Sequence, residues 1–234
     1  MLRRKEEHIK GGEKIRSILL GLNDGLISTF TLLVGVAVAT MALGNTIVIL
    51  TGLAEMFSAA ISMGLGEYIS SKSQLKYYRN EIIRESAEID LFPEEEKLEV
   101  RESFEKMGVT GTALNEVVES ITSDKQRWLD FMVKDELGFS DEPYSPILGG
   151  TLTFLAFLIG AFIPLFPYFI ELGFISLIIS SSLSFIILFT VGALKKYITG
   201  EKWLKAGIEM VIIGAIAFTV SYLIGLILER MVVG

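Results

Sequence analysis

The sequence predicts an all-α integral membrane protein, with five membrane-spanning helices and a polar helical domain inserted between the second and the third. The first indication is composition: 51% of the 234 residues are hydrophobic and the mean hydropathy is +0.53, which is too apolar for an ordinary soluble domain. The second is a set of five apolar runs, each long enough to cross about 30 Å of hydrocarbon as a helix. These runs cover residues 15–43, 46–71, 147–168, 172–194 and 206–228.

The chain is therefore expected to fall into three parts. Residues 1–71 hold a basic tail and the first two spans, residues 72–145 form the polar domain, and residues 146–234 hold the last three spans. The first apolar run is longer than the apolar part of a signal peptide, so we expect it to remain in the protein as a span.

The distribution of Lys and Arg predicts the orientation in the membrane, since loops rich in these residues stay in the cytoplasm. The turn at residues 44–45 and the stretch over 164–171 contain neither residue type, so both are expected outside. The tail, the polar domain and the last loop are expected in the cytoplasm, and the C-terminus outside. The basic residues used are Arg3, Arg4, Lys5, Lys10, Lys14 and Arg16 in the tail, and Lys195, Lys196, Lys202 and Lys205 in the last loop.

The polar segment over 72–145 is predicted to be mostly helical. It holds 18 acidic and ten basic residues, which gives it a net charge of −8. The second apolar run continues into it without a helix breaker. Three more helices are expected: one that begins at Pro93 and ends near Gly108, one over 112–121, and one that starts with a capping box of Ser123 and Gln126 and stops at Gly138.

The absence of cysteine, and a single histidine (His8, in the tail), exclude several kinds of site within the chain. Disulfides, thiolate zinc sites and iron–sulfur clusters need cysteine, and a di-iron centre of the Glu-x-x-His type needs more histidine. No nucleophile–base set and no redox-competent site stand out. We therefore expect no enzyme activity, no permanently bound cofactor and no nucleic-acid partner.

Two Glu-x-x-Glu pairs in the polar segment are candidate cation ligands. Residues three apart share a helix face, so Glu85 with Glu88, and Glu96 with Glu99, each offer four oxygens of the kind that Mg, Ca, Mn and Fe(II) bind. The last helix adds Met132 and Glu136, which are four apart. The alternative is that the glutamates form a solvated face, and that Met132 is a core residue.

The first two spans carry ionisable side chains that hydrocarbon disfavours. Asp24 and Glu55 each lie nine residues, or about 13 Å, from the start of their apolar run, so antiparallel neighbours would hold them at similar depth. A charge at the bilayer centre costs about 2.5–3.5 kcal/mol on insertion scales, and such residues usually face a bundle interior or a polar path. Met63 and Glu67 follow on the second span, one turn apart on one face, and extend this set toward the cytoplasm.

A structural role is the alternative for these acids. Asp24 could hydrogen-bond Asn23, Ser28 or Thr29, and Glu209 in the last span could do the same or lie near the inner surface. Three acids in two spans favour a polar pathway over three separate structural bonds.

Three stretches resemble the vacuolar iron transporter family: GLNDGLISTFTLLVGVA, AEMFSAAISMGLGEYISSKSQ and LTFLAFLIGAFIPLFPY. The similarity covers essentially the whole chain, including the acidic insert after the second span. It implies a homodimer of five-span subunits that exports Fe(II) from the cytoplasm in exchange for protons. It also implies that Asp24, Glu55 and Met63 line the path, with Glu67 less constrained because some members have Gly there.

The same resemblance implies a metal-binding role for the inserted domain, through Glu85, Glu88, Glu96, Glu99, Met132 and Glu136. One departure concerns Val133, where plant members have a second Met. This puts the preference of the domain for Fe(II) in question.

The sequence-based hypothesis is therefore a proton-coupled transporter of Fe(II), and also of Mn(II), with these ions as substrates. Its expected partners are membrane lipid, a second copy of the chain, divalent ions and protons. The alternative is a membrane-anchored metal buffer or sensor without transport. The acids inside the spans distinguish the two, because a buffer needs none of them.

Overall fold

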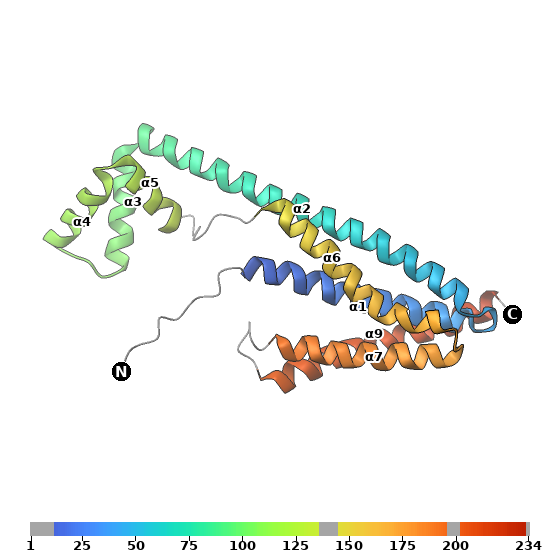
Figure 1. Cartoon of the computed structure of the whole chain (residues 1–234). Coiled ribbons are helices and arrows are strands. Elements are labelled where there is room, and N and C mark those ends of the chain that lie inside the picture. The colour runs from blue at the N-terminus through green and yellow to red at the C-terminus, as the bar shows by residue number, and fades with distance from the viewer. Residues whose placement is uncertain (1–11, 136–144, 196–201, 233–234) are drawn as a thin grey trace. The chain divides into compact units, whose positions relative to one another are not determined.

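The computed structural model of the chain describes residues 12–135, 145–195 and 202–232, and all regular structure in these residues is helical. Five of the described helices are long and apolar enough to span a membrane. Figure 1 shows the helices in chain order by colour. The prediction of an all-helical membrane protein with five spans is confirmed. The cytoplasmic position and metal binding of the inserted segment stay predictions.

The first two long helices are α1 (Gly12–Ala39) and α2 (Asn45–Leu91), joined by a short 3₁₀ turn, η1 (Met41–Leu43). Gly44 closes the turn with φ of 78°, a backbone conformation that favours glycine. α2 is one continuous helix of 47 residues, so the expected absence of a breaker after the second apolar run is confirmed.

The last three long helices are α6 (Pro146–Leu165), extended by the 3₁₀ turn η2 (Phe166–Ile170), then α7 (Phe174–Leu194) and α9 (Trp203–Val232). Their bounds agree with the predicted apolar runs to within a few residues. At the connection between η2 and α7, Gly173 has a φ of 60°, which allows the tight reversal there.

The chain divides into two compact units. The membrane unit comprises Met1–Tyr68 and Pro146–Gly234, and the polar unit comprises Ile69–Ser145. α2 contributes residues to both.

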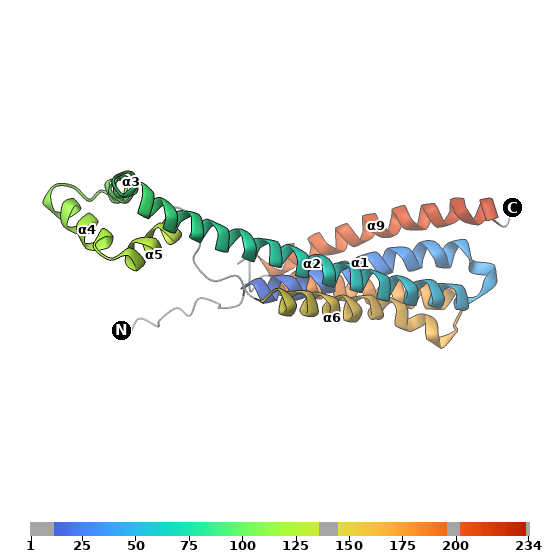
Figure 2. The ribbon, with the colours of Figure 1, turned by 90° about the horizontal axis from the view of Figure 1, so that it is seen from above.

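Glycines bring the helices of the membrane unit into close contact. A β-carbon on Gly25 of α1 would lie 2.3 Å from the main-chain oxygen of Phe157 in α6, and one on Gly21 would lie 2.4 Å from that of Thr153. Two small residues four apart on one helix face permit this approach in membrane helices. Figure 2 shows α1, α2 and α6 side by side within the membrane unit. α1 also packs against α7 and α9, so most of its circumference is covered.

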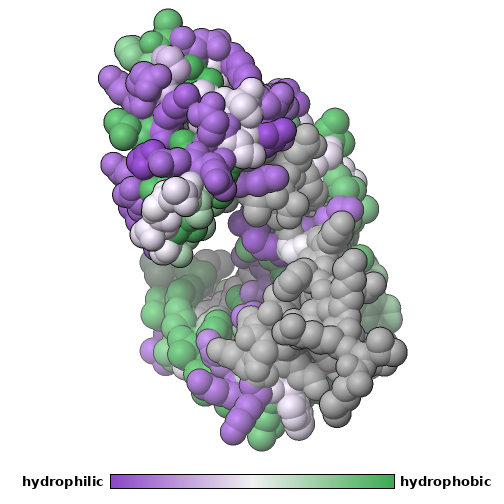
Figure 3. Space-filling view, turned by 90° about the vertical axis from the view of Figure 1, so that its left-hand side faces the viewer, coloured by the Kyte–Doolittle hydropathy of each residue, from purple (hydrophilic) through white to green (hydrophobic). Residues whose placement is uncertain are grey.

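The polar unit folds around a small apolar core. The end of α2, together with α3 (Pro93–Lys106), α4 (Thr112–Thr122) and α5 (Lys125–Asp135), supplies the buried side chains of Ile89, Val100, Leu114, Val118, Trp128 and Met132. Hydrophilic side chains cover much of the surface that this unit presents in Figure 3.

The predicted capping box of the last polar helix is wrong. Asp124 caps α5, because its Oδ1 accepts a hydrogen bond from the main-chain nitrogen of Arg127 at 2.8 Å. Ser123 instead ends α4, and its Oγ donates to the main-chain oxygen of Ser120 at 3.0 Å. Asp124 takes the capping position because it lies one residue closer to the start of α5 than Ser123 does. The predicted stop at Gly138 lies outside the described residues.

Candidate functional site

Asp24 is exposed on α1, within an apolar helix. None of the described residues forms a hydrogen bond or an ion pair with its carboxylate. Ser28 Oγ and Thr29 Oγ1, two of the partners considered for a structural bond, are buried and have no hydrogen-bond partner among the described residues. Among the described residues, the structural alternative for Asp24 therefore finds no support.

Helix packing explains why Asp24 is on the open side of α1. Gly21 and Gly25 face α6. Asp24 lies between these glycines in sequence but on another face of α1, one turn after Leu20 and two turns after Arg16. Arg16, Leu20 and Asp24 are four apart and all exposed. They form one exposed stripe, on which Arg16 reaches Glu67 of α2.

The predicted path residues of α2 differ in their surroundings. Met63 is half-buried and packs against the apolar cluster that includes Met56 and Phe157. Glu55 is also half-buried. Beside Glu55 runs an exposed stripe of small residues, four apart along the helix: Ala54, Ser58, Ser62 and Gly66. α2 therefore carries a small, partly polar surface at the depth of its carboxylate.

Glu67, another predicted path residue, makes polar contacts with two residues of α1. Its Oε1 accepts a hydrogen bond from Ser17 Oγ at 3.1 Å, and Arg16 Nη2 lies 3.7 Å from the same oxygen. Only 8% of the Glu67 side chain is exposed, against 63% for Arg16. The carboxylate is thus held at the N-terminal end of α1.

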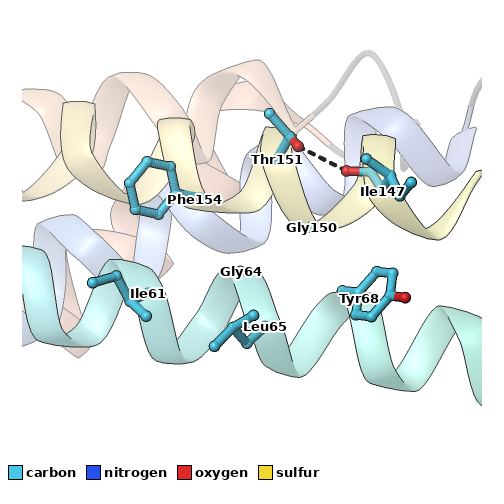
Figure 4. Close-up of a pocket in the computed structure, with 8 residues that line it drawn as sticks. All are labelled: Ile61, Gly64, Leu65, Tyr68, Ile147, Gly150, Thr151 and Phe154. Carbon is cyan, nitrogen blue, oxygen red and sulfur yellow. Dashed lines mark hydrogen bonds between the residues drawn. The ribbon is translucent and has the colours of Figure 1, made fainter.

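A different face of α2 forms a groove with α6, shown in Figure 4. Its volume is about 350 Å³. The lining is almost wholly apolar, and Thr151 Oγ1 is already bonded to the main-chain oxygen of Ile147 at 2.8 Å. None of the residues that line the groove carries a carboxylate or a thioether for a cation. The residues that line it are Ile61, Gly64, Leu65, Tyr68, Ile147, Gly150, Thr151 and Phe154.

Two of the predicted cation ligands in the polar unit are buried. Glu85 is 1% exposed and Glu96 is 7% exposed. Each is one helical turn before a core residue, Ile89 for Glu85 and Val100 for Glu96, and these two core residues belong to one cluster. Buried carboxylates are uncommon because desolvating a charge costs free energy, so this pair differs from a solvated acidic face.

The other predicted ligands divide into three cases. Glu88 is half-exposed and lies 3.6 Å from Arg84, an i,i+4 pair that fits a solvated face. Glu99 and Met132 both line an open groove, but Met132 is only 2% exposed and packs in the apolar core, which supports the alternative that it is a core residue. Glu136 lies outside the described residues. The groove is also lined by Glu102, Ser103, Lys106, Met107 and Asp135.

Within the described parts of the chain, no three Asp, Glu or His side chains are grouped so that they could hold a metal ion. The structure brings Glu67 together with Ser17 and Arg16, and places Glu99 and Met132 along one groove. It does not group all four glutamates of the two Glu-x-x-Glu pairs around one point. The predicted metal ligands therefore stay predictions.

The comparison with known families identifies the chain. The model of the VIT family matches residues 15–226, which is most of the sequence. The chain belongs to the VIT family. It is 34% identical over 227 residues to vacuolar iron transporter 1 of Arabidopsis thaliana, which covers 96% of this chain and 90% of that protein.

Other relatives extend the VIT family similarity to distant organisms. The chain is 36% identical over 222 residues to the vacuolar iron transporter of Centaurea cyanus, with 94% of this chain and 90% of that protein covered. It is 30% identical over 236 residues to the vacuolar iron transporter of Plasmodium falciparum, with 96% and 86% covered. These relatives are named as transporters, so the predictions of the family and of a non-enzyme are confirmed.

Sequence reasoning missed some polar residues of this VIT-family chain. Ser17 and Thr153 carried no signal, because a single hydroxyl residue in an apolar run is common. Arg16 was counted only as a tail charge that sets orientation. Asp135 was not selected, although its Oδ2 accepts a hydrogen bond from Ser103 and it lines the groove beside Met132. Only the tertiary contacts identify these residues.

Proposed function

We propose that this member of the VIT family carries Fe(II), and Mn(II) less effectively, out of the cytoplasm in exchange for protons. Support comes from the relatives named vacuolar iron transporter, with 30–36% identity along nearly the whole chain. The observation that carries the proposal is Asp24, an exposed carboxylate on an apolar spanning helix without a described partner.

The energetic argument rests on the cost of that carboxylate. A charged side chain at the bilayer centre costs about 2.5–3.5 kcal/mol on insertion scales, and such residues generally serve ion or proton pathways. Asp24 and Glu55 would act both as cation ligands and as proton acceptors, since a carboxylate must lose its proton to bind a metal. Because each carboxylate binds either a metal ion or a proton, the flow of metal is coupled to the flow of protons.

The same exposed residues support a homodimer. Asp24 cannot face acyl chains without cost, so a second copy of the chain would cover the α1 stripe of Arg16, Leu20 and Asp24. The stripe of small residues on α2, from Ala54 to Gly66, would allow the helices of two copies to approach closely. In this arrangement the path runs where the two copies meet.

The polar unit would collect metal on the cytoplasmic side. Buried Glu85 and Glu96, and the Glu99–Met132 pair in the groove, are its best-supported ligands. Carboxylate oxygens suit Mn(II) and Fe(II), whereas a thioether adds affinity for Fe(II) over hard ions. The orientation follows from the basic residues of the tail and of the last loop.

A direct test uses the full chain in liposomes that contain a ferrous-sensitive dye or a pH-sensitive dye. We expect Fe(II) influx to be accompanied by proton movement in the opposite direction, and to follow an imposed pH gradient. Uptake of Fe(II), Mn(II), Zn(II) and Ca(II) should fall in the order Fe(II), Mn(II), then little of either other ion. Fe(II) flux that ignores the pH gradient would contradict proton coupling. Metal binding without any flux would favour a membrane-anchored buffer or sensor.

A further inference from the structure

Three helices of the membrane unit are joined near the start of α1 by two adjacent residues, Arg16 and Ser17. Both contact the same oxygen of Glu67 on α2, Ser17 Oγ at 3.1 Å and Arg16 Nη2 at 3.7 Å. Thr153 Oγ1 on α6 donates to the main-chain oxygen of Ser17 at 3.4 Å. Ser17 and Thr153 are 1% and 0% exposed. Ser17 therefore ties α1 to both α2 and α6.

Ser17 and Arg16 differ in how easily they are displaced from the Glu67 carboxylate. The Arg16 side chain is 63% exposed and its contact of 3.7 Å is longer than a charge-assisted hydrogen bond, about 2.7–2.9 Å. Because solvent reaches the guanidinium, this long contact contributes little to stability although the carboxylate is buried. Ser17 is buried between helices, so its hydroxyl keeps the carboxylate in position while the guanidinium can leave.

Glu67 lies on α2 at a point that an incoming cation would reach before Met63. Met63 lies one turn earlier on the same face and belongs to the proposed path. A cation that moves from the cytoplasmic end toward Met63 passes Glu67 first. A divalent cation carries twice the charge of a guanidinium and prefers carboxylate oxygens, so it competes well with Arg16 for this site.

We propose that Arg16, Ser17 and Glu67 form an exchangeable gate at the cytoplasmic entrance of the metal path. The incoming cation displaces Arg16 from Glu67, and the contact between α1 and α2 loosens at this end. Ser17 is a positioning residue that holds the carboxylate and is not itself a ligand. The gate rests on the proposed transport function, which supplies the cation and the direction of approach.

The first test compares transport kinetics of single and double variants of the full chain in liposomes. Arg16→Gln removes the competitor, so the Fe(II) concentration for half-maximal flux should fall about two- to five-fold, the range that the energy of an exposed ion pair implies. Glu67→Gln should raise that concentration. In the Glu67→Gln background, Arg16→Gln should change nothing. An equal fall with Lys14→Gln, an exposed lysine on the same helix, would reduce the effect to surface charge and overturn the gate.

The second test detects the opening itself and needs no transport. The chain contains no cysteine, so Ser17→Cys introduces the only thiol. In anaerobic buffer, Fe(II) should raise its rate of modification by a water-soluble thiol reagent several-fold. The matched control is Ser184→Cys on α7, which is equally buried and far along the chain, and its rate should not respond. Equal rates at residue 17 with and without Fe(II) would overturn the gate.

Conservative replacement separates positioning from packing. Ser17→Thr keeps the hydroxyl and should retain the wild-type half-saturating concentration, whereas Ser17→Ala should raise it. If Ser17→Ala and Ser17→Thr behave alike, the hydroxyl does not position Glu67. Lack of Fe(II) flux in the unaltered chain contradicts the proposed function, whereas normal flux with unresponsive Arg16 and Ser17 variants contradicts only the gate.

Discussion

Gly160 of α6 packs directly on Leu22 of α1, and a β-carbon at residue 160 would lie 2.2 Å from the main-chain oxygen of Leu22. No real side chain tolerates that distance, so the two helices are in backbone contact at this point. Since Leu22 is two residues before Asp24, this contact also fixes the position of Asp24 along the helix axis relative to α6.

We therefore expect Gly160→Ala to destabilise the membrane unit by about 1–3 kcal/mol, the usual cost of forcing extra volume into a packed site. Thermal unfolding of the detergent-solubilised chain measures this. Gly12→Ala is the control, because nothing lies within 4 Å of a β-carbon there. Equal unfolding temperatures for the two variants would mean that α1 and α6 are free to separate.

Asp24→Ala is expected to abolish Fe(II) transport and to leave the folded protein intact. The reason is that Asp24 forms no hydrogen bond or ion pair with other described residues, so its removal takes away no polar bond that stabilises the chain. Flux into dye-loaded liposomes and a thermal unfolding curve should be measured on the same preparation. Glu229→Ala on α9 serves as a control acid. Unimpaired uptake in the Asp24 variant would remove this residue from the mechanism.

Met63→Leu should reduce Fe(II) transport several-fold more than Mn(II) transport. Fe(II) follows Mn(II) in the affinity order and gains more from a sulfur ligand. Met56→Leu is the matched control, since Met56 packs in the same cluster two turns earlier and is 7% exposed. An equal loss for both ions would indicate that Met63 acts through packing or gating.

Changing buried Glu85 and Glu96 to Gln should weaken Fe(II) or Mn(II) binding by the full chain, measured by calorimetry. The expected loss is at least tenfold, because each variant removes a desolvated carboxylate. Glu94 and Glu95 lie in the first turn of α3 and are exposed, so changing both of them to Gln provides a matched loss of charge. If both double variants bind equally well, the acidic residues form only a solvated face.

Asp124→Ala should lower the stability of the polar unit by about 1 kcal/mol, the typical worth of an N-cap. Ser123→Ala should cost less, because Ser123 does not cap α5. Fluorescence of Trp128, in a background where Trp203 is changed to Phe, reports unfolding of this unit alone, since the chain has two tryptophans. A larger effect at Ser123 would restore the capping box that the sequence predicted.

The sequence alone determined the elements of this protein. Apolar runs of 20 residues or more have no other stable outcome in a membrane than helices, so five spans and their approximate bounds followed from hydropathy. Pro93 and the continuous pattern after Ser71 located the start of α3 and the length of α2. The carboxylates inside the spans were identifiable for the same reason, because a charge in an apolar run is conspicuous.

Tertiary structure decided how those elements are used. Whether a glutamate is buried, as Glu85 is, or paired with an arginine, as Glu88 is, depends on which helix packs against it. The sequence spacing does not distinguish these two residues, because they belong to the same Glu-x-x-Glu pair. The contacts of Ser17 with Glu67 and Thr153 join residues 50 and 136 positions apart. Local sequence carries no record of such contacts, because they arise from the close approach of helices at glycines, and that approach is set by the packing of the whole unit.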